Sequence, residues 1–369
     1  MYWVLQVFLA AAGIQVIYYL LFFARLNFVR GFKGLPEFLP PASVVICARN
    51  EADNLRQNLK VVLIQQYQQF EVIVVNDGST DDTLDVLAEY YKRNTNMKLI
   101  SLPAGAERPY AGKKYALKKG IEAASFDTIV VTDADCRPSS TSWLAKLVGA
   151  YLQDTKIVLS HSPFEKRPGF LNKLIRYENF ITALQYFGFA ASGLPYMGVG
   201  RNLSYKKSLF EKFKGFEKNP ALVSGDDDLF INAVATGKNT TLCIDKDAFM
   251  VTKAEATFRD WLNQKRRHLR TGFSYKLHHQ ALLFLFATAK FAFYTFFIAA
   301  VALHQPIILV GSVFAGVVLL QAILTWRIFV KLGVGDLKIF SPILDIIYSG
   351  YLLLIFLLLL LKPKDNWKI

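Results

Sequence analysis

The segment Ile129-Val130-Val131-Thr132-Asp133-Ala134-Asp135 combines a short apolar run with two carboxylates that follow it directly. Four β-branched residues in succession are typical of a buried strand. Two carboxylates at positions i and i+2 beyond a strand can reach one ligand site together, and carboxylate oxygens suit Mg²⁺ and Mn²⁺. The segment therefore predicts a strand that ends in a candidate metal site, Asp133 and Asp135. Because aspartate is also common in turns, the pair alone is compatible with an ordinary turn.

Similar strand-like runs alternate with amphipathic helices on both sides of this segment. The predicted strands are 43–47, 71–75, 98–102, 128–132 and 157–160, and the predicted helices are 54–66, 82–93, 113–124 and 140–151. This alternation predicts an α/β fold, in which helices cover both faces of a mostly parallel sheet. Ligands of such sheets bind just beyond the carboxyl ends of the strands, so the site residues are expected there.

Acidic residues follow three of the predicted strands. Glu51 comes shortly after the first strand, Asp77 follows the second, and Asp133 follows the fourth. Carboxylates that converge on one sheet edge repel each other unless a divalent cation or donor groups of a ligand lie among them. The stretch 77–82 is also compatible with a simple turn and helix cap.

Two further clusters carry charge near the end of the α/β region. Asp226 and Asp227 belong to a run of three carboxylates at the start of a predicted helix, where the helix dipole accounts for one or two of them. Gln264 and Arg267 lie in a basic helical run, 259–270. That run is either a solvated or lipid-facing charged surface, or a clamp on phosphate oxygens, for which guanidinium groups are suited.

Hydrophobic residues make up 53% of the 369 residues and are concentrated in long blocks. The first block, 3–24, contains no charge, and three more blocks cover 281–303, 306–326 and 341–361. About 20 apolar residues span a bilayer, so each block predicts a transmembrane helix. Because no basic residues precede the first block and it is long, it predicts an anchor rather than a signal peptide.

The basic residues indicate the orientation of the chain. Arg25, Arg30 and Lys33 follow the first block, so the region after it is expected in the cytosol and the N-terminus outside. Four crossings would place the basic tail 362–364 outside, so one of the last three blocks need not cross. Lys290 and Asp345 lie within these blocks, where each needs either a partner in the bundle or a functional role.

The composition also excludes several classes of protein. Three cysteines are too few for a disulfide scaffold, and the sequence contains no P-loop and no dinucleotide-binding motif. The net charge of +14 comes without a nucleic-acid-binding motif, so we expect no nucleic-acid partner. It suits a domain held against anionic lipid. Residues 166–189 predict an interfacial amphipathic helix with Lys166, Arg167, Lys173 and Arg176 on its cationic side, or else an ordinary core-facing helix.

In their order along the chain, these motifs resemble the membrane-bound family 2 glycosyltransferases of GT-A fold. The motifs, over about residues 41–272, are Asn50-Glu51, Asp77-Gly78-Ser79, Gly112-Lys113, Asp133-Ala134-Asp135, Gly225-Asp226-Asp227 and Gln264-x-x-Arg267-His268. They are most similar to the group that includes ceramide glucosyltransferase and the processive polysaccharide synthases. The resemblance implies an N-terminal transmembrane anchor over 1–25, a GT-A domain over 41–272, and a C-terminal transmembrane bundle over 280–362.

The resemblance also implies roles for residues on the donor side. Glu51 and Asp77 would contact the uridine of a nucleotide-sugar, and Lys113 would lie beside it. Asp133 would contact the nucleotide or the sugar and lie next to the metal. Asp135 would bind the Mg²⁺ or Mn²⁺ ion on the diphosphate.

On the acceptor side, the resemblance implies that Asp226 is the base that deprotonates the acceptor hydroxyl. Gln264 and Arg267 would hold the diphosphate and the acceptor. Two positions depart from the family pattern. Its usual Thr-Glu-Asp is Ser224-Gly225-Asp226 here, so an alignment shifted by one residue would make Asp227 the base. The usual Trp after the arginine is His268.

The function that this resemblance implies is an inverting hexosyltransferase of the cytoplasmic membrane, with its catalytic domain in the cytosol. It would transfer a sugar from a nucleotide-sugar, a UDP-sugar, to a lipid or lipid-linked acceptor. One base without a covalent nucleophile fits a single displacement with inversion. Two alternatives are a subunit of a processive polysaccharide synthase and a catalytically inactive membrane scaffold that binds nucleotide-sugars.

Overall fold

The computed structural model describes residues 2–29, 31, 38–105, 109–110, 112–152, 154–217 and 225–360, the side chains at 268, 270 and 356–360 excepted. Some residues named in the sequence analysis lie outside the described residues and side chains. They are Arg30, Lys33, Ser224, the His268 side chain and the tail 362–364. The chain divides into two compact units. The helical unit comprises Met1–Val29, Lys166–Ser192 and Glu255–Asn366, and the sheet unit comprises Arg30–Glu165, Gly193–Ala254 and Trp367–Ile369. Of the domain predicted over 41–272, residues 166–192 and 255–272 fall in the helical unit, and the extent of the catalytic domain stays a prediction.

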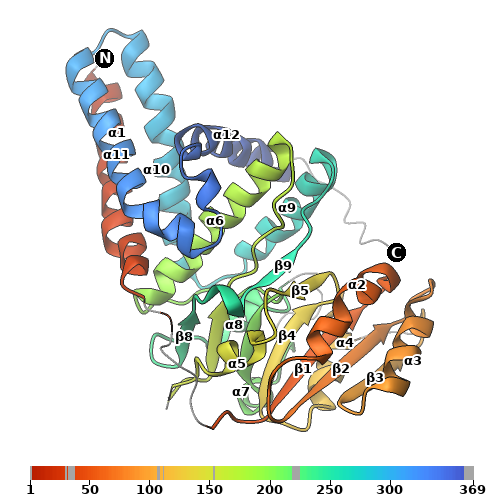
Figure 1. Cartoon of the computed structure of the whole chain (residues 1–369). Coiled ribbons are helices and arrows are strands. Elements are labelled where there is room, and N and C mark those ends of the chain that lie inside the picture. The colour runs from red at the N-terminus through yellow and green to blue at the C-terminus, as the bar shows by residue number, and fades with distance from the viewer. Residues whose placement is uncertain are drawn as a thin grey trace. The chain divides into compact units, whose positions relative to one another are not determined.

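The sheet unit is built on a seven-stranded sheet in the order β3-β2-β1-β4-β7-β6-β8 (Figure 1). Its strands are β1 (Ala42–Ala48), β2 (Phe70–Asp77), β3 (Met97–Leu102), β4 (Thr128–Asp133), β6 (Ile157–Ser160), β7 (Leu203–Lys206) and β8 (Thr240–Cys243). Strands β1 to β4 are parallel, β7 is antiparallel to β4 and β6, and β6 is parallel to β8. A small second sheet pairs β5 (Cys136–Pro138) with β9 (Met250–Thr252). The mostly parallel α/β sheet predicted from the sequence is confirmed.

Helices cover both faces of this sheet. They are α2 (Ala52–Leu63), α3 (Thr83–Arg93), α4 (Lys114–Glu122), α5 (Trp143–Val148), α7 (Lys207–Lys212), α8 (Asp228–Val234) and a short 3₁₀ turn at Lys246–Ala248. Alternate strand residues such as Val44, Val72 and Val130 join the apolar side chains of α2, α3 and α5 in one buried core. On the opposite face α4 crosses β1 at Gly120, where a Cβ atom would collide with Val45. Because the helices pack on the two faces, loops follow the carboxyl ends of β1, β2 and β4.

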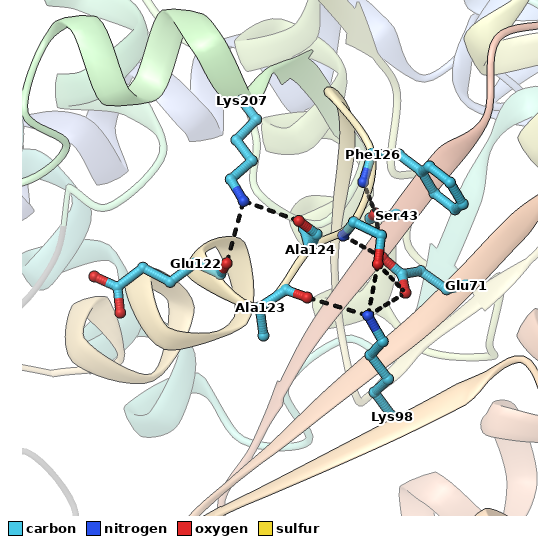
Figure 2. Close-up of polar contacts among 9 residues, drawn as sticks. Ser43, Glu71, Lys98, Glu122, Ala123, Ala124, Phe126 and Lys207 are labelled. Carbon is cyan, nitrogen blue, oxygen red and sulfur yellow. Dashed lines mark hydrogen bonds and ion pairs between the residues drawn. The ribbon is translucent and has the colours of Figure 1, made fainter.

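A polar cluster holds the opposite, amino-terminal end of the sheet together (Figure 2). Glu71 accepts hydrogen bonds from Ser43 Oγ at 2.7 Å and from the Ser125 backbone N–H at 2.6 Å, and its other oxygen lies 2.7 Å from Lys98 Nζ. Lys98 and Lys207 also donate to carbonyl oxygens at the end of α4 (Figure 2). The cluster therefore attaches α4 and the start of β4 to the middle of the sheet.

The helical unit contains the apolar blocks. Its elements are α1 (Tyr2–Tyr18), a π-helical turn (Tyr19–Phe23), a 3₁₀ turn (Ala24–Asn27), α6 (Phe170–Ala191), α9 (Phe258–Gly272), α10 (Leu277–Ala302), α11 (Ile307–Lys331), a 3₁₀ turn (Gly335–Leu337) and α12 (Ser341–Leu360). Within the described residues, three helical stretches are long and apolar enough to cross a membrane: Tyr2–Asn27, Leu277–Ala302 and Ile307–Lys331. Helices α1, α10 and α11 run side by side, whereas α12 runs in a different direction (Figure 1). The fourth predicted block, 341–361, corresponds to α12. Its apolar part among the described residues, Ser341–Ile355, is shorter than the three candidate spans.

The two charges that fall inside the apolar blocks pair with each other. Lys290 of α10 forms an ion pair with Asp345 of α12, and both residues are buried. The Asp345 carboxylate also accepts hydrogen bonds from Tyr177 and Tyr294, each at 2.6 Å. The expectation of a partner within the bundle is thus met, and a buried carboxylate with three donors is well compensated.

Helix α6 differs from the expected one-sided amphipathic helix. Its buried residues lie around most of its circumference, and Arg176, expected on the cationic side, is only 3% exposed. Its guanidinium group makes two hydrogen bonds to Asp336, at 2.9 and 2.7 Å. The polar residues of α6 predict a solvent-facing side, but Arg176 is paired with Asp336 inside the protein, so they do not mark an exposed face. A position at the membrane interface stays a prediction.

Candidate active site

The loops after β1 and β2 are joined by side chains that hydrogen-bond to backbone groups. Asn50 adopts a positive φ of 57°, and its backbone N–H donates to Ser79 Oγ at 3.0 Å while its side-chain oxygen accepts from the Thr80 N–H at 2.8 Å. The backbone N–H of Glu51 donates to Thr83 Oγ1 at 2.8 Å. The stretch 77–82 is thus a turn, as its composition allowed, and it also fixes the loop that carries Glu51.

Glu51 and Asp77 lie at the carboxyl-terminal edge of the sheet, because Glu51 directly precedes α2 and Asp77 ends β2. Asp77 is the last residue of β2 and is buried, and Gly78 takes a positive φ of 65° to turn the chain. Glu51 Oε2 accepts a hydrogen bond from Asn54 at 2.6 Å. Burial raises the pKa of Glu51, and repulsion from Asp135 and Asp133 adds to this in spite of the Asn54 hydrogen bond. The carboxylates after β1 and β4 are therefore near enough to repel each other.

Lys113 joins two of the predicted acidic residues. It lies directly before α4, and its Nζ atom is 2.6 Å from Asp133 Oδ1 and 3.2 Å from Asp226 Oδ2. Burial disfavours the charged ammonium group, but Asp133 and Asp226 outweigh it and raise the pKa of Lys113 well above its usual value. Burial likewise opposes ionisation of Asp133, yet Lys113, with a smaller effect of Arg201, lowers the pKa of that carboxyl. Both groups are therefore charged at neutral pH.

Asp133 and Asp135 bring their ligand atoms together at the end of β4. Their carboxylates and the Cys136 thiol lie within 4.8 Å of one another, the one such group of metal-ligand side chains among the described residues. Asp135 accepts hydrogen bonds from Cys136 Sγ at 3.2 Å and from Thr252 Oγ1 at 3.1 Å. Both of these donors are neutral, and two carboxylates that lie this close together fit a divalent cation with oxygen ligands.

Asp226 and Asp227 have different surroundings although they are adjacent. Asp227 caps α8: its oxygens accept the N–H groups of Asp228, at 2.8 Å, and of Gly200. Burial and the neighbouring Asp226 raise the pKa of Asp227 to about 6. Asp226 Oδ2 is buried, with Lys113 as its ionic partner. The lone pairs of Asp227 are thus engaged by backbone groups, whereas Asp226 lies with the residues around Lys113.

The sheet unit therefore brings together most of the predicted site residues. Asp133 and Asp226 meet at Lys113, while Glu51 and Asp135 lie near Asp133. Gln264 and Arg267 belong to α9 of the helical unit, so their contact with a diphosphate stays a prediction.

Sequence reasoning did not assign two residues that shape this site. Arg201 lies near enough to Asp133 to lower its pKa, and Thr252 orients Asp135 from β9. Arg201 comes shortly before β7, a strand that the sequence analysis did not predict. Thr252 is 117 residues from its partner and offers no local signal.

Comparison with known sequences finds similarity to glycosyltransferases. Residues 43–213 match the model of Glycosyl transferase family 2. The chain is 33% identical over 93 residues to the poly-beta-1,6-N-acetyl-D-glucosamine synthase of Staphylococcus epidermidis, covering 25% of this chain and 21% of that protein. It is 28% identical over 243 residues to the probable glycosyltransferase YdaM of Bacillus subtilis (strain 168), covering 63% of this chain and 55% of that protein. The matches thus span about a fifth and about half of these relatives.

A solved structure shares the fold over nearly the whole chain. The mannosyltransferase PcManGT from Pyrobaculum calidifontis, in complex with GDP-Man and Mn²⁺, superposes with a TM-score of 0.60 at 18% identity. The match covers 93% of this chain and 97% of that one. The expected GT-A fold is therefore confirmed.

Proposed function

Residues 43–213 form a family 2 glycosyltransferase domain, and on that premise we propose that the protein transfers a sugar from a nucleotide-sugar to a lipid or lipid-linked acceptor. The observation that carries this is the position of Lys113 between Asp133, at 2.6 Å, and Asp226, at 3.2 Å. Lys113 thereby links Asp133, predicted to contact the donor, to Asp226, the predicted base. We propose a UDP-sugar as the donor, and the solved mannosyltransferase of the same fold, bound to GDP-Man, supports the class of nucleotide-sugars.

The chain's own residues account for the steps of transfer. Asp226 accepts the proton of the acceptor hydroxyl as that oxygen attacks the anomeric carbon of the sugar and the bond from this carbon to the diphosphate breaks. One attack from the face opposite the leaving group inverts the configuration. Arg267, with Gln264, holds the diphosphate and offsets its growing negative charge. Glu51 and Asp77 orient the base and ribose of the donor.

A divalent cation fits Asp133 and Asp135, because their carboxylates lie close together. The described hydrogen bonds to Asp135 come from two neutral groups, the Cys136 thiol and the Thr252 hydroxyl. Bound there, Mg²⁺ or Mn²⁺ would stabilise the negative charge of the leaving diphosphate. Thr252 and Cys136 hold the Asp135 carboxylate in place by hydrogen bonds.

We also propose that the protein is integral to the cytoplasmic membrane, with its sheet unit in the cytosol. Among the described residues, three helical stretches are long enough to span a bilayer and support this, and Arg25 at the end of the first supports the orientation. With three crossings the basic tail 362–364 is cytosolic, which removes the conflict that four crossings create. Nucleotide-sugar and membrane-embedded acceptor then meet at the inner membrane surface.

One experiment tests the activity. The purified protein in detergent is incubated with lipid extract and each of UDP-glucose, UDP-N-acetylglucosamine and GDP-mannose, and both nucleoside diphosphate release and lipid masses are measured. We expect one donor to yield a lipid heavier by one sugar residue. Binding of a nucleotide-sugar with no turnover would instead indicate the inactive scaffold.

A second candidate is a processive polysaccharide synthase, because of the similarity to the poly-beta-1,6-N-acetyl-D-glucosamine synthase. In the same experiment it would produce a series of polymer masses rather than a single addition.

A further inference from the structure

A buried carboxylate on α6 contacts α9, the helix that carries Gln264 and Arg267. Glu178 is only 4% exposed, and its Oε2 atom accepts a hydrogen bond from Trp261 Nε1 at 2.7 Å. The same oxygen lies 3.1 Å from Lys265 Nζ. Trp261 and Lys265 are four residues apart and therefore lie on one face of α9. One carboxylate thus binds two successive turns of this helix.

The Trp261 side chain fixes the same face of α9 against α12. Its ring is fully buried and stacks on Tyr351, with the ring centroids 4.0 Å apart and the planes at 6°. A stacked, hydrogen-bonded tryptophan has one orientation, so α9 cannot rotate about its axis without breaking both contacts. Burial raises the pKa of Glu178, and the charge of Lys265 acts against this.

This anchored face determines where the neighbouring face points. Gln264 and Arg267 are three residues apart and share a face of α9. At 3.6 residues per turn, that face lies about 110° around the helix from the face of Trp261 and Lys265. A change in the rotation of α9 would therefore move Gln264 and Arg267 together.

We propose that Glu178 is a positioning residue for sugar transfer, which holds α9 at the rotation in which Gln264 and Arg267 bind the donor diphosphate. The proposal rests on the proposed function, which assigns Gln264 and Arg267 to the diphosphate. Glu178 acts only through α9 and touches neither donor nor acceptor. Its loss therefore weakens donor binding without removing the base or the carboxylates of the sheet unit.

The test compares variants of the full-length enzyme in detergent by KM for the donor, kcat and unfolding temperature. Glu178→Ala should raise the donor KM about tenfold, or 1.4 kcal/mol. Glu178→Gln keeps an oxygen acceptor for Trp261 and should recover part of that loss. Trp261→Phe keeps the ring on Tyr351 but removes the N–H donor, and should raise KM in the same way. Combined with Arg267→Ala, Glu178→Ala should add little, because the clamp is already lost.

Arg176→Met is the matched control, because Arg176 is also a buried charge on α6 but pairs with Asp336 instead of α9. It should lower the unfolding temperature and leave the donor KM unchanged. A Glu178→Ala enzyme with the wild-type KM, or a control with an equally raised KM, overturns the positioning role alone. A wild-type protein that turns over no nucleotide-sugar overturns the proposed function and this proposal with it.

Discussion

The ammonium nitrogen of Lys113 lies 3.2 Å from Asp226 Oδ2, a buried carboxylate oxygen. Lys113 also lies 2.6 Å from Asp133 at the end of β4. One cation thus offsets the charges of two carboxylates that come from distant parts of the chain. Without it the two partly buried carboxylates would lose their shared ionic partner and repel each other, which is costly.

Replacing Lys113 by methionine should therefore impair turnover. The substitution keeps an unbranched apolar chain but removes the charge, so Asp133 and Asp226 lose their shared partner. We expect kcat/KM to fall about 10- to 100-fold, or about 1.4–2.8 kcal/mol. Lys118→Met on α4, where Lys118 contacts Tyr110, is the control and should stay near wild type. Equal activity of the two variants would remove Lys113 from the site.

Metal removal should abolish sugar transfer, and Mn²⁺ or Mg²⁺ should restore it. Thr252→Val removes the hydroxyl that orients Asp135, so half-maximal activity should need about 10- to 100-fold more metal. Thr241→Val removes a hydroxyl from β8, where it contacts Thr155, and should not change the metal requirement. Full activity in excess EDTA would contradict the assignment of Asp133 and Asp135.

Labelling of single cysteines tests the orientation of the chain. In a variant without Cys47, Cys136 and Cys243, we expect an impermeant maleimide on intact cells to label Gln305→Cys, between α10 and α11. Lys60→Cys, exposed on α2, should be labelled only after the membrane is opened. Labelling of Lys60→Cys in intact cells would place the sheet unit outside.

The Glu71 cluster should make stability depend on pH. Burial opposes ionisation of Glu71, but hydrogen bonds from Lys98, Ser43 and the Ser125 N–H lower its pKa below the usual 4.5. Because the folded pKa is the lower one, this stabilisation is fully present above pH 4.5 and is lost as the pH falls through the folded value. Glu71→Ala should cost about 2 kcal/mol at pH 7.

Unfolding of wild type and Glu71→Ala in detergent between pH 7 and pH 3 measures this dependence. The difference between the two proteins should shrink below pH 4.5. A difference that stays constant to pH 3 would show that the charge of Glu71 does not stabilise the fold.

Strands β1, β2 and β4 could be predicted from the sequence because each contains a continuous run of apolar, mostly β-branched residues. Strand β7, Leu203–Lys206, was not predicted, since its four residues include serine and lysine and it pairs antiparallel with distant strands. Strands β5 and β9 have three residues each and form only through their mutual pairing. Strands of three or four residues are too short to be identified from the pattern of their own residues.

The same distinction applies to the site. Asp77 and Asp133 were predictable, because they follow strong strand patterns and parallel strands end at one edge. Asp227 differs from Asp226 in accepting the N–H of Gly200, 27 residues away, and no local pattern reveals this contact. Sequence reasoning could therefore identify the carboxylates at the strand ends but not the contacts that divide their roles.

Asp226 is proposed as the base that activates the acceptor, and paired substitutions test this role most directly. Asp226→Asn keeps the shape and removes the basicity, so kcat should fall about 10²–10⁴-fold while UDP affinity is retained. Asp227→Asn should be milder in kcat, because Asp227 caps α8 and holds Gly200. The measurement is kcat and UDP affinity for both variants side by side. An inactive Asp227→Asn enzyme beside an active Asp226→Asn enzyme would make Asp227 the base, and normal turnover in both would contradict the mechanism.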